Sequence, residues 1–248
     1  MALPQTRAAL KAADRLAIDA VRLRRGPRGA ELNLADHRFI IPALSEWMHQ
    51  VSHAIDAEAD SVRATLLNTA AYRSTYADDL TSDLAAAAKS VRHADYPINH
   101  GAAVGIMRDI HHLHIRDHDD AMSQPGWNLR HAAGTAIDTA AEWHSTLGRR
   151  STLGRDQAAT MARHAVIIDM TGALITEMDI TLAAEAKLIA KAYRRIPAAA
   201  GLPGMAAAII EPFTTARRTL RRASCHLDAA LDAITAAVTR GTWKVPAS

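Results

Sequence analysis

The chain has 248 residues and a formal net charge of +3 at pH 7, so it can bury a sizeable core and is only mildly basic. It contains 54 alanines and ten aromatic residues, a composition that favours closely packed helices over a large aromatic-lined pocket. The single cysteine excludes an internal disulfide, and no apolar run approaches the roughly 18 residues of a membrane span. These features predict an alanine-rich cytoplasmic protein with no membrane partner.

Apolar residues recur at helical spacing along almost the whole chain. Expected helices cover about 6–25, 43–72, 74–93, 99–122, 127–147, 156–195 and 204–240. Pro42 is expected to open the second of these, Tyr96-Pro97 to break the chain, and Asn99 to cap the fourth helix. No stretch alternates as a strand does. The sequence therefore predicts an all-α antiparallel bundle of six to eight helices with short turns, forming one domain over 1–248 with a candidate sub-boundary near 145–155.

The helix expected over 109–120 is the richest in candidate ligands. His111, His114 and His118 fall within about 60° of arc on the flank of its apolar stripe, and Asp117 continues that stripe. Imidazoles at such spacing can share a divalent transition metal, so these four residues form the leading candidate metal site. The alternative is a solvated or pH-responsive histidine face, since no signature such as H-E-x-x-H accompanies them.

A second, weaker set lies on the helix expected over 43–72. His49, His53, Asp56 and Asp60 follow one another at spacings of 4, 3 and 4, which places all four on one helix face. If this helix pairs with the helix over 109–120, a metal site between two helices becomes feasible. The competing interpretation is again an ordinary solvated face.

Four arginines gather on the last expected helix, opposite its apolar stripe. Guanidinium groups at this density can bind phosphates or a carboxylate-rich protein, so the cluster is the candidate anion-binding face. Residues 29–125, in contrast, carry fourteen acidic and seven basic side chains. No nucleic-acid-binding motif is present, so nucleic acid is only one candidate partner and a solvated arginine face is the alternative. The arginines are Arg217, Arg218, Arg221 and Arg222.

Two further patterns concern packing. Asp179 interrupts an apolar seam in the helix over 156–195, and we expect it to pair with an arginine of a neighbouring helix because buried charges are usually paired. Gly101 and Gly105 are expected to permit close approach of two helices.

Two classes of function follow. The first is a non-enzymatic α-helical binding or assembly protein that engages an anionic or helical partner, through a protein contact or self-association. The second is a metal-dependent, hydrolase-like enzyme that uses the His/Asp-rich stretch 109–120 and a divalent transition metal as cofactor.

Overall fold

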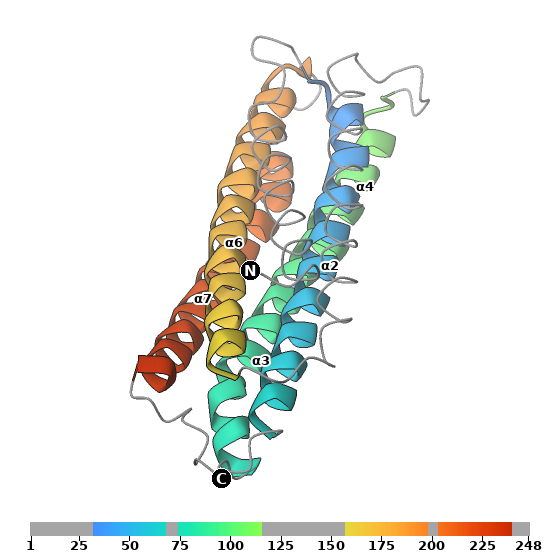
Figure 1. Ribbon diagram of the computed structural model, residues 1–248. Helices are drawn as coiled ribbons and strands as arrows, with labels where there is room; N and C mark the ends of the chain where they lie inside the picture. Colours follow the sequence, from blue (N-terminus) through green and yellow to red (C-terminus); the bar gives the residue numbers. More distant parts are fainter. Residues whose placement is uncertain (1–31, 68–73, 116–156, 198–202, 240–248) are drawn as a thin grey trace, which may run out of the picture.

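The computed structural model describes residues 32–67, 74–115, 157–197 and 203–239, and nearly all of them are helical (Figure 1). The all-α prediction is confirmed for these ranges, which contain no strand. The elements are α2 (Leu34–Leu67), α3 (Ser74–Tyr96), the π-helical segment η1 (Pro97–Ala103), α4 (Val104–His112), α6 (Gln157–Arg194) and α7 (Pro203–Thr239).

The described elements form four packed rods, because α3, η1 and α4 follow one another without a break. The larger number of six to eight helices is not reached within these ranges. The helices expected over 6–25 and 127–147, and the candidate boundary near 145–155, lie outside the described residues. None of the described helices combines the length and the apolar character that crossing a membrane requires.

Helix α2 begins at Leu34, nine residues before the expected start at about 43. The backbone N–H of Asn33 donates to Asp36 Oδ2 (2.8 Å), and the N–H of Asp36 donates to Asn33 Oδ1 (3.0 Å). This reciprocal arrangement satisfies backbone donors at the helix start. Pro42 therefore lies inside the helix, and its expected role as the opening residue is wrong. Burial of the Leu34 and Ile41 side chains in the first turns of α2 offsets the backbone hydrogen bond that Pro42 cannot donate.

The expected break at Tyr96-Pro97 is also wrong, because the chain stays helical through it. Tyr96 has φ −52° and ψ −53°, so α3 runs into η1 without a break, and Pro97 is the first residue of the π-helical segment. Asn99 accordingly lies within η1 and does not cap a new helix. The buried side chains of Ile98 and Ala102 hold this π-helical turn against the bundle.

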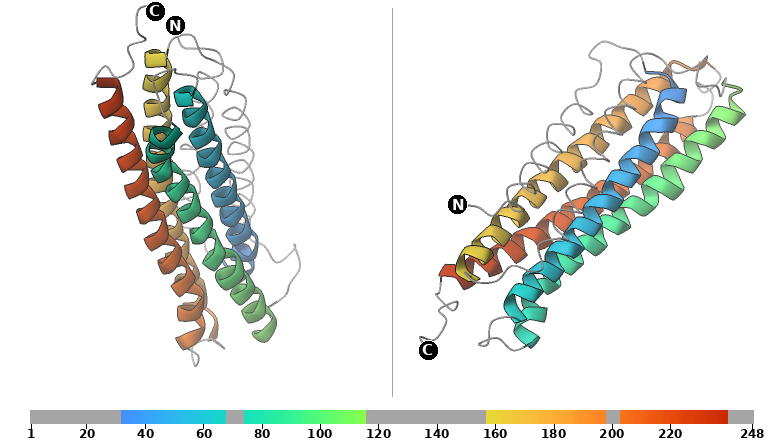
Figure 2. Two further views of the ribbon diagram at one scale, coloured as in Figure 1. Left: turned by 90° about the horizontal axis from the view of Figure 1, so that it is seen from below. Right: turned by 45° about the vertical axis from the view of Figure 1, so that its right-hand side comes forward.

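Each rod packs beside two others in the order α2, α3, α7, α6 and back to α2 (Figures 1 and 2). Neighbouring rods run antiparallel. Asp83 near the start of α3 contacts His226 in the second half of α7, for example, whereas Gly101 in η1 lies against Pro212 in its first half. The arrangement is a four-helix bundle within the described residues.

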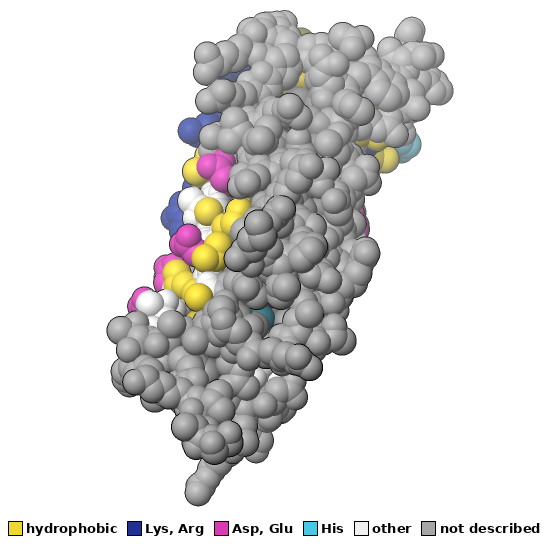
Figure 3. Space-filling model, viewed as in Figure 1, with side chains coloured by type: hydrophobic (Ala, Val, Ile, Leu, Met, Phe, Trp, Pro, Cys, Tyr) yellow, Lys and Arg dark blue, Asp and Glu magenta, His cyan; other side chains and the backbone are white. Residues whose placement is uncertain are grey.

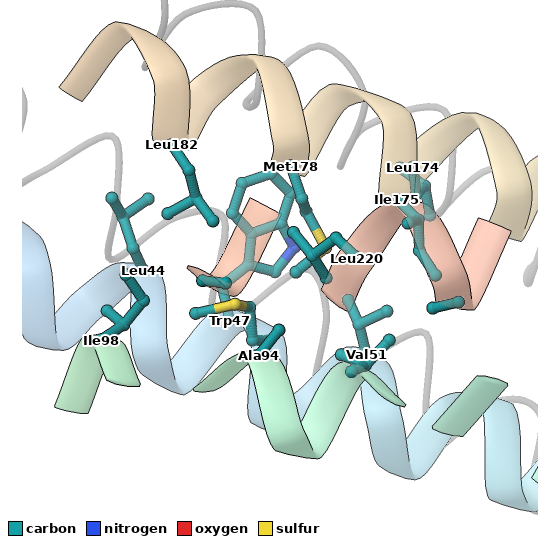
Figure 4. Packing of buried hydrophobic residues seen from close by; sticks show 14 of the residues in the cluster. Leu44, Trp47, Val51, Ala94, Ile98, Leu174, Ile175, Met178, Leu182 and Leu220 are labelled. Atoms are coloured by element: carbon teal, nitrogen blue, oxygen red, sulfur yellow. The ribbon is translucent and has the colours of Figure 1, made fainter. Parts of the chain in front are cut away.

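The core fills the space between the rods. In Figure 4, side chains of α2 and α6 point toward one another, and Ala94, Ile98 and Leu220 complete the layer from α3, η1 and α7. Trp47 is the largest fully buried side chain and lies near the middle of α2. Burying a large apolar side chain of this kind contributes about 1.5–3 kcal/mol, so this layer contributes much of the stability.

As expected, Gly101 and Gly105 permit close packing: they allow the rod formed by α3, η1 and α4 to lie directly on α7. A Cβ atom at Gly101 would approach Pro212 Cγ to 2.8 Å, and one at Gly105 would overlap the end of the Ile209 side chain. Gly172 in α6 differs from both, because a Cβ there would meet nothing within 4 Å.

We predict opposite effects for two glycine-to-alanine substitutions. Gly172→Ala should stabilise the protein by about 0.5–1 kcal/mol, because alanine favours the helix. Gly101→Ala should be net destabilising, because overpacking against the rigid ring of Pro212 costs about 1–3 kcal/mol. Urea unfolding of both variants measures this difference, and equal stabilisation of the two would show that the contact with α7 imposes no constraint.

Candidate functional site

The stretch 109–120 does not form the helix that was expected to align its histidines. α4 ends at His112, Leu113 leaves helical geometry, and His114 has a positive φ of 53°. The imidazole of His114 turns back to the carbonyl oxygen of His112, with Nδ1 3.1 Å from it. His111 and His114 are both exposed but share no helical arc, because the helix ends between them. Asp117 and His118 lie outside the described residues.

Asp109, at the start of this stretch, has a structural role. Its side chain is buried, and Tyr193 at the end of α6 donates its hydroxyl hydrogen to Asp109 Oδ2 at 2.6 Å. Arg108 Nε lies 3.0 Å from the other carboxylate oxygen. Burial, followed by the hydrogen bond to Asp109, raises the pKa of Tyr193. These contacts fasten α4 to α6 through a buried carboxylate whose two oxygens are both occupied.

The weaker candidate set on α2 is partly assembled. His49 and His53 bring their Nε2 atoms to 3.1 Å, with their rings nearly perpendicular. Asp56, however, is paired with Arg92 of α3, so its carboxylate is directed to a guanidinium. Asp60 is exposed one turn further on. Among the residues that the structure describes, no three His, Cys, Asp or Glu side chains are arranged to hold one metal ion.

The expected partner of Asp179 is confirmed, and it comes from the arginine cluster. Arg217 Nε lies 2.7 Å from Asp179 Oδ1, and Arg221 Nε lies 3.2 Å from Oδ2. Two of the four arginines are thus directed to a carboxylate of α6. Arg218 and Arg222 are exposed on α7 and remain candidates for contact with an anion.

Two histidines that the sequence analysis did not single out are buried in the core, each beside a glutamate. His37 Nδ1 of α2 lies 2.6 Å from Glu185 Oε1 of α6, and His164 Nδ1 of α6 lies 2.6 Å from Glu58 Oε1 of α2. The histidines are 0% and 1% exposed. Since a carboxylate oxygen accepts, Nδ1 of each imidazole is the donor.

The surroundings of the two imidazoles differ at Nε2. The Nε2 atom of His164 lies 3.0 Å from the hydroxyl of Thr65, whereas the buried Nε2 atom of His37 makes no hydrogen bond. Leaving a buried polar nitrogen unpaired costs stability. The two contacts therefore share their histidine–glutamate geometry but not their full environment.

A repeat in the sequence underlies this pair of contacts. The pattern His37-x-x-Ile40-Ile41, followed by Glu58-Ala59, recurs 127 residues later as His164-x-x-Ile167-Ile168, followed by Glu185-Ala186. Because α2 and α6 run antiparallel, each histidine faces the glutamate of the other copy. The two helices are thus related by an approximate two-fold, and this repeat was the sequence signal that could have revealed both pairs.

Asp95 of α3 lies close to His49 of α2 and to His100 of η1. The hydroxyl of Ser45 donates to its carboxylate, and His49 lies within electrostatic range. Burial is nevertheless the largest influence and raises the pKa of Asp95 above 3.8. This side of the bundle therefore carries a partly buried carboxylate close to two histidines.

Comparison with known proteins does not assign these features: no protein family model, curated protein or solved structure matches the chain.

We predict strong coupling within the buried contact between α2 and α6. Glu185→Leu should destabilise the protein by about 3–5 kcal/mol, because it leaves a buried imidazole without its acceptor. Adding His37→Leu should recover much of that loss, since an apolar pair needs no hydrogen bond. Denaturant unfolding of both single variants and the double variant tests this, and strictly additive effects would argue against the pairing.

We predict a pH-dependent effect for Asp95→Asn. A carboxyl group with a raised pKa in the folded state binds its proton more tightly there than in the unfolded chain, so stability falls as pH rises from 3.8 through that raised pKa. Asparagine does not titrate and can still accept from Ser45. The variant should gain stability relative to the wild type between acidic and neutral pH. Thermal unfolding across that range checks the sign, and a constant difference would contradict it.

Proposed function

We propose that this chain is a non-enzymatic helical binding protein that self-associates through the outer face of η1 and α4. We call this the α4 face and define it by Tyr96, His100, Val104, Met107 and His111. The observation that carries the proposal is the exposure of its apolar members: Tyr96 is 66% exposed, Val104 60% and Met107 42%.

The α4 face is a continuous ridge along one side of a rod whose other side is buried. Its members follow one another at spacings of four or three residues, which places them in one row. Figure 3 shows hydrophobic and histidine side chains together at the edge of the molecule that α4 occupies. A row of this kind is the form in which a helix presents itself to another helix.

The composition of the row favours a second copy of the chain as partner. The row itself contains no lysine, arginine or carboxylate, and the exposed Arg108 next to it is paired with the carboxylate of Asp109, which offsets its charge. Val104 lies at its centre. An antiparallel pairing about a two-fold through Val104 would place the Tyr96–His100 ring pair of one copy beside Met107 and His111 of the other.

Two observations support this reading over the other candidates. An anionic partner would need the arginine cluster, yet Arg217 and Arg221 are already directed to Asp179. Catalysis by the buried imidazoles would need access to substrate, yet His37 and His164 have almost no exposed surface. A row of only five side chains is smaller than the usual stable interface, so we expect a weak and reversible association.

Sedimentation velocity over a range of protein concentrations tests the proposal. The wild type should shift from monomer toward dimer as concentration rises, and Val104→Glu with Met107→Glu should abolish that shift, because each glutamate would place an unpaired charge in the contact. The matched control is Val166→Glu on α6, where another apolar side chain is 48% exposed.

The control variant should dimerise as the wild type does. A wild type that remains monomeric at every concentration would refute self-association.

A photo-reactive amino acid at position 104, compared with one at position 166, then tests the wider binding role in cells. Equal labelling from both positions would count against any partner at the α4 face.

A further inference from the structure

The histidine pair on α2 has a geometry that its sequence spacing alone does not guarantee. His49 is exposed and His53 is partly exposed, and their Nε2 atoms converge to 3.1 Å. Without a bound ion, one imidazole must donate and the other accept, because each neutral ring carries a single N–H. The two Nε2 atoms are thus close together, on side chains that reach the surface.

That separation also suits two ligands of one transition-metal ion. Nitrogens about 2.0–2.1 Å from a metal, at angles between a right angle and the tetrahedral angle, lie roughly 2.9–3.4 Å apart. The observed 3.1 Å falls inside this interval, so the two nitrogens already have a separation that one ion can span. Imidazole nitrogen is a preferred ligand of Zn²⁺, Ni²⁺ and Cu²⁺.

The charges around the pair favour a cation. Asp95 lies within electrostatic range of His49, and Glu46 is close enough to influence Asp95. The nearby guanidinium of Arg92 is paired with Asp56, which offsets its repulsion of a cation. A metal held by the two imidazoles would therefore sit beside carboxylates, with water filling the remaining coordination positions.

We propose that His49 and His53 form a surface site for a divalent transition-metal ion of the zinc, nickel or copper type. The protein supplies two nitrogen ligands, one turn apart on α2, and the neighbouring carboxylates contribute charge without coordinating. The site shares no residue with the α4 face, but His100 of that face and His49 both interact electrostatically with Asp95.

Calorimetric titration of the full chain with zinc chloride or nickel chloride, after treatment with a chelator, tests the site. The wild type should bind metal, and His53→Gln should weaken the affinity by at least about tenfold, because only one imidazole ligand remains. In the copper-loaded protein, the electron paramagnetic resonance spectrum should report two nitrogen ligands, and fewer in the variant.

The matched control is a double variant, His111→Gln with His114→Gln, which removes two exposed members of the histidine-rich stretch. It should leave metal affinity unchanged. Circular dichroism of each variant verifies folding, which surface substitutions of this kind should preserve. Failure of the folded wild type to bind any of these metals would overturn the site. Undiminished affinity in His53→Gln, or loss of affinity in the control, would do so as well.

Discussion

The two buried histidine–glutamate contacts determine how α2 and α6 are aligned, and the rest of the bundle depends on that alignment. Apolar side chains at three- and four-residue spacing would tolerate a slide of one helix by a turn, about 5.4 Å. Such a slide would separate His37 from Glu185 and His164 from Glu58 together, breaking both buried contacts at once. One register is therefore far more stable than its neighbours. α3 and α7 follow, because each packs along one of these two helices.

The same contacts make the bundle approximately symmetric, and the proposed functional features lie where that symmetry fails. Positions 127 residues after the histidine pair hold Thr176 and Ile180, so α6 has no equivalent of the proposed metal site. The π-helical segment lies in the rod after α2, whereas α7 continues as an α-helix past Pro212. The contacts that the two halves share thus stabilise the bundle. The features that only one half has make the faces of the molecule differ from one another.

Much of the fold could be predicted from local patterns, and the exceptions share a cause. Helical spacing correctly predicted α6 and α7, the partner of Asp179 and the close contact at Gly101, because these depend on which face of a helix is apolar. The helix start expected at Pro42 and the break expected at Pro97 were wrong, because the buried side chains of Ile41 and Ile98 beside the two prolines favour the packed helix over the local penalty. The buried pairs escaped prediction because each joins residues more than 100 positions apart, and only the repeat connects them.

The π-helical segment has a consequence for how the chain tolerates changes in length. A π-helical turn holds one more residue per hydrogen-bonded ring than an α-helical turn. Deleting a single residue from Pro97–Ala103 would let the rod relax to an ordinary α-helix, and the residue removed is the extra one that the wider turn had accommodated. Gly105 would then keep its position against Ile209, and Asp109 would stay beside Tyr193. A one-residue deletion should therefore be tolerated better within this segment than within α2, α6 or α7, where it would rotate everything after it by about 100°.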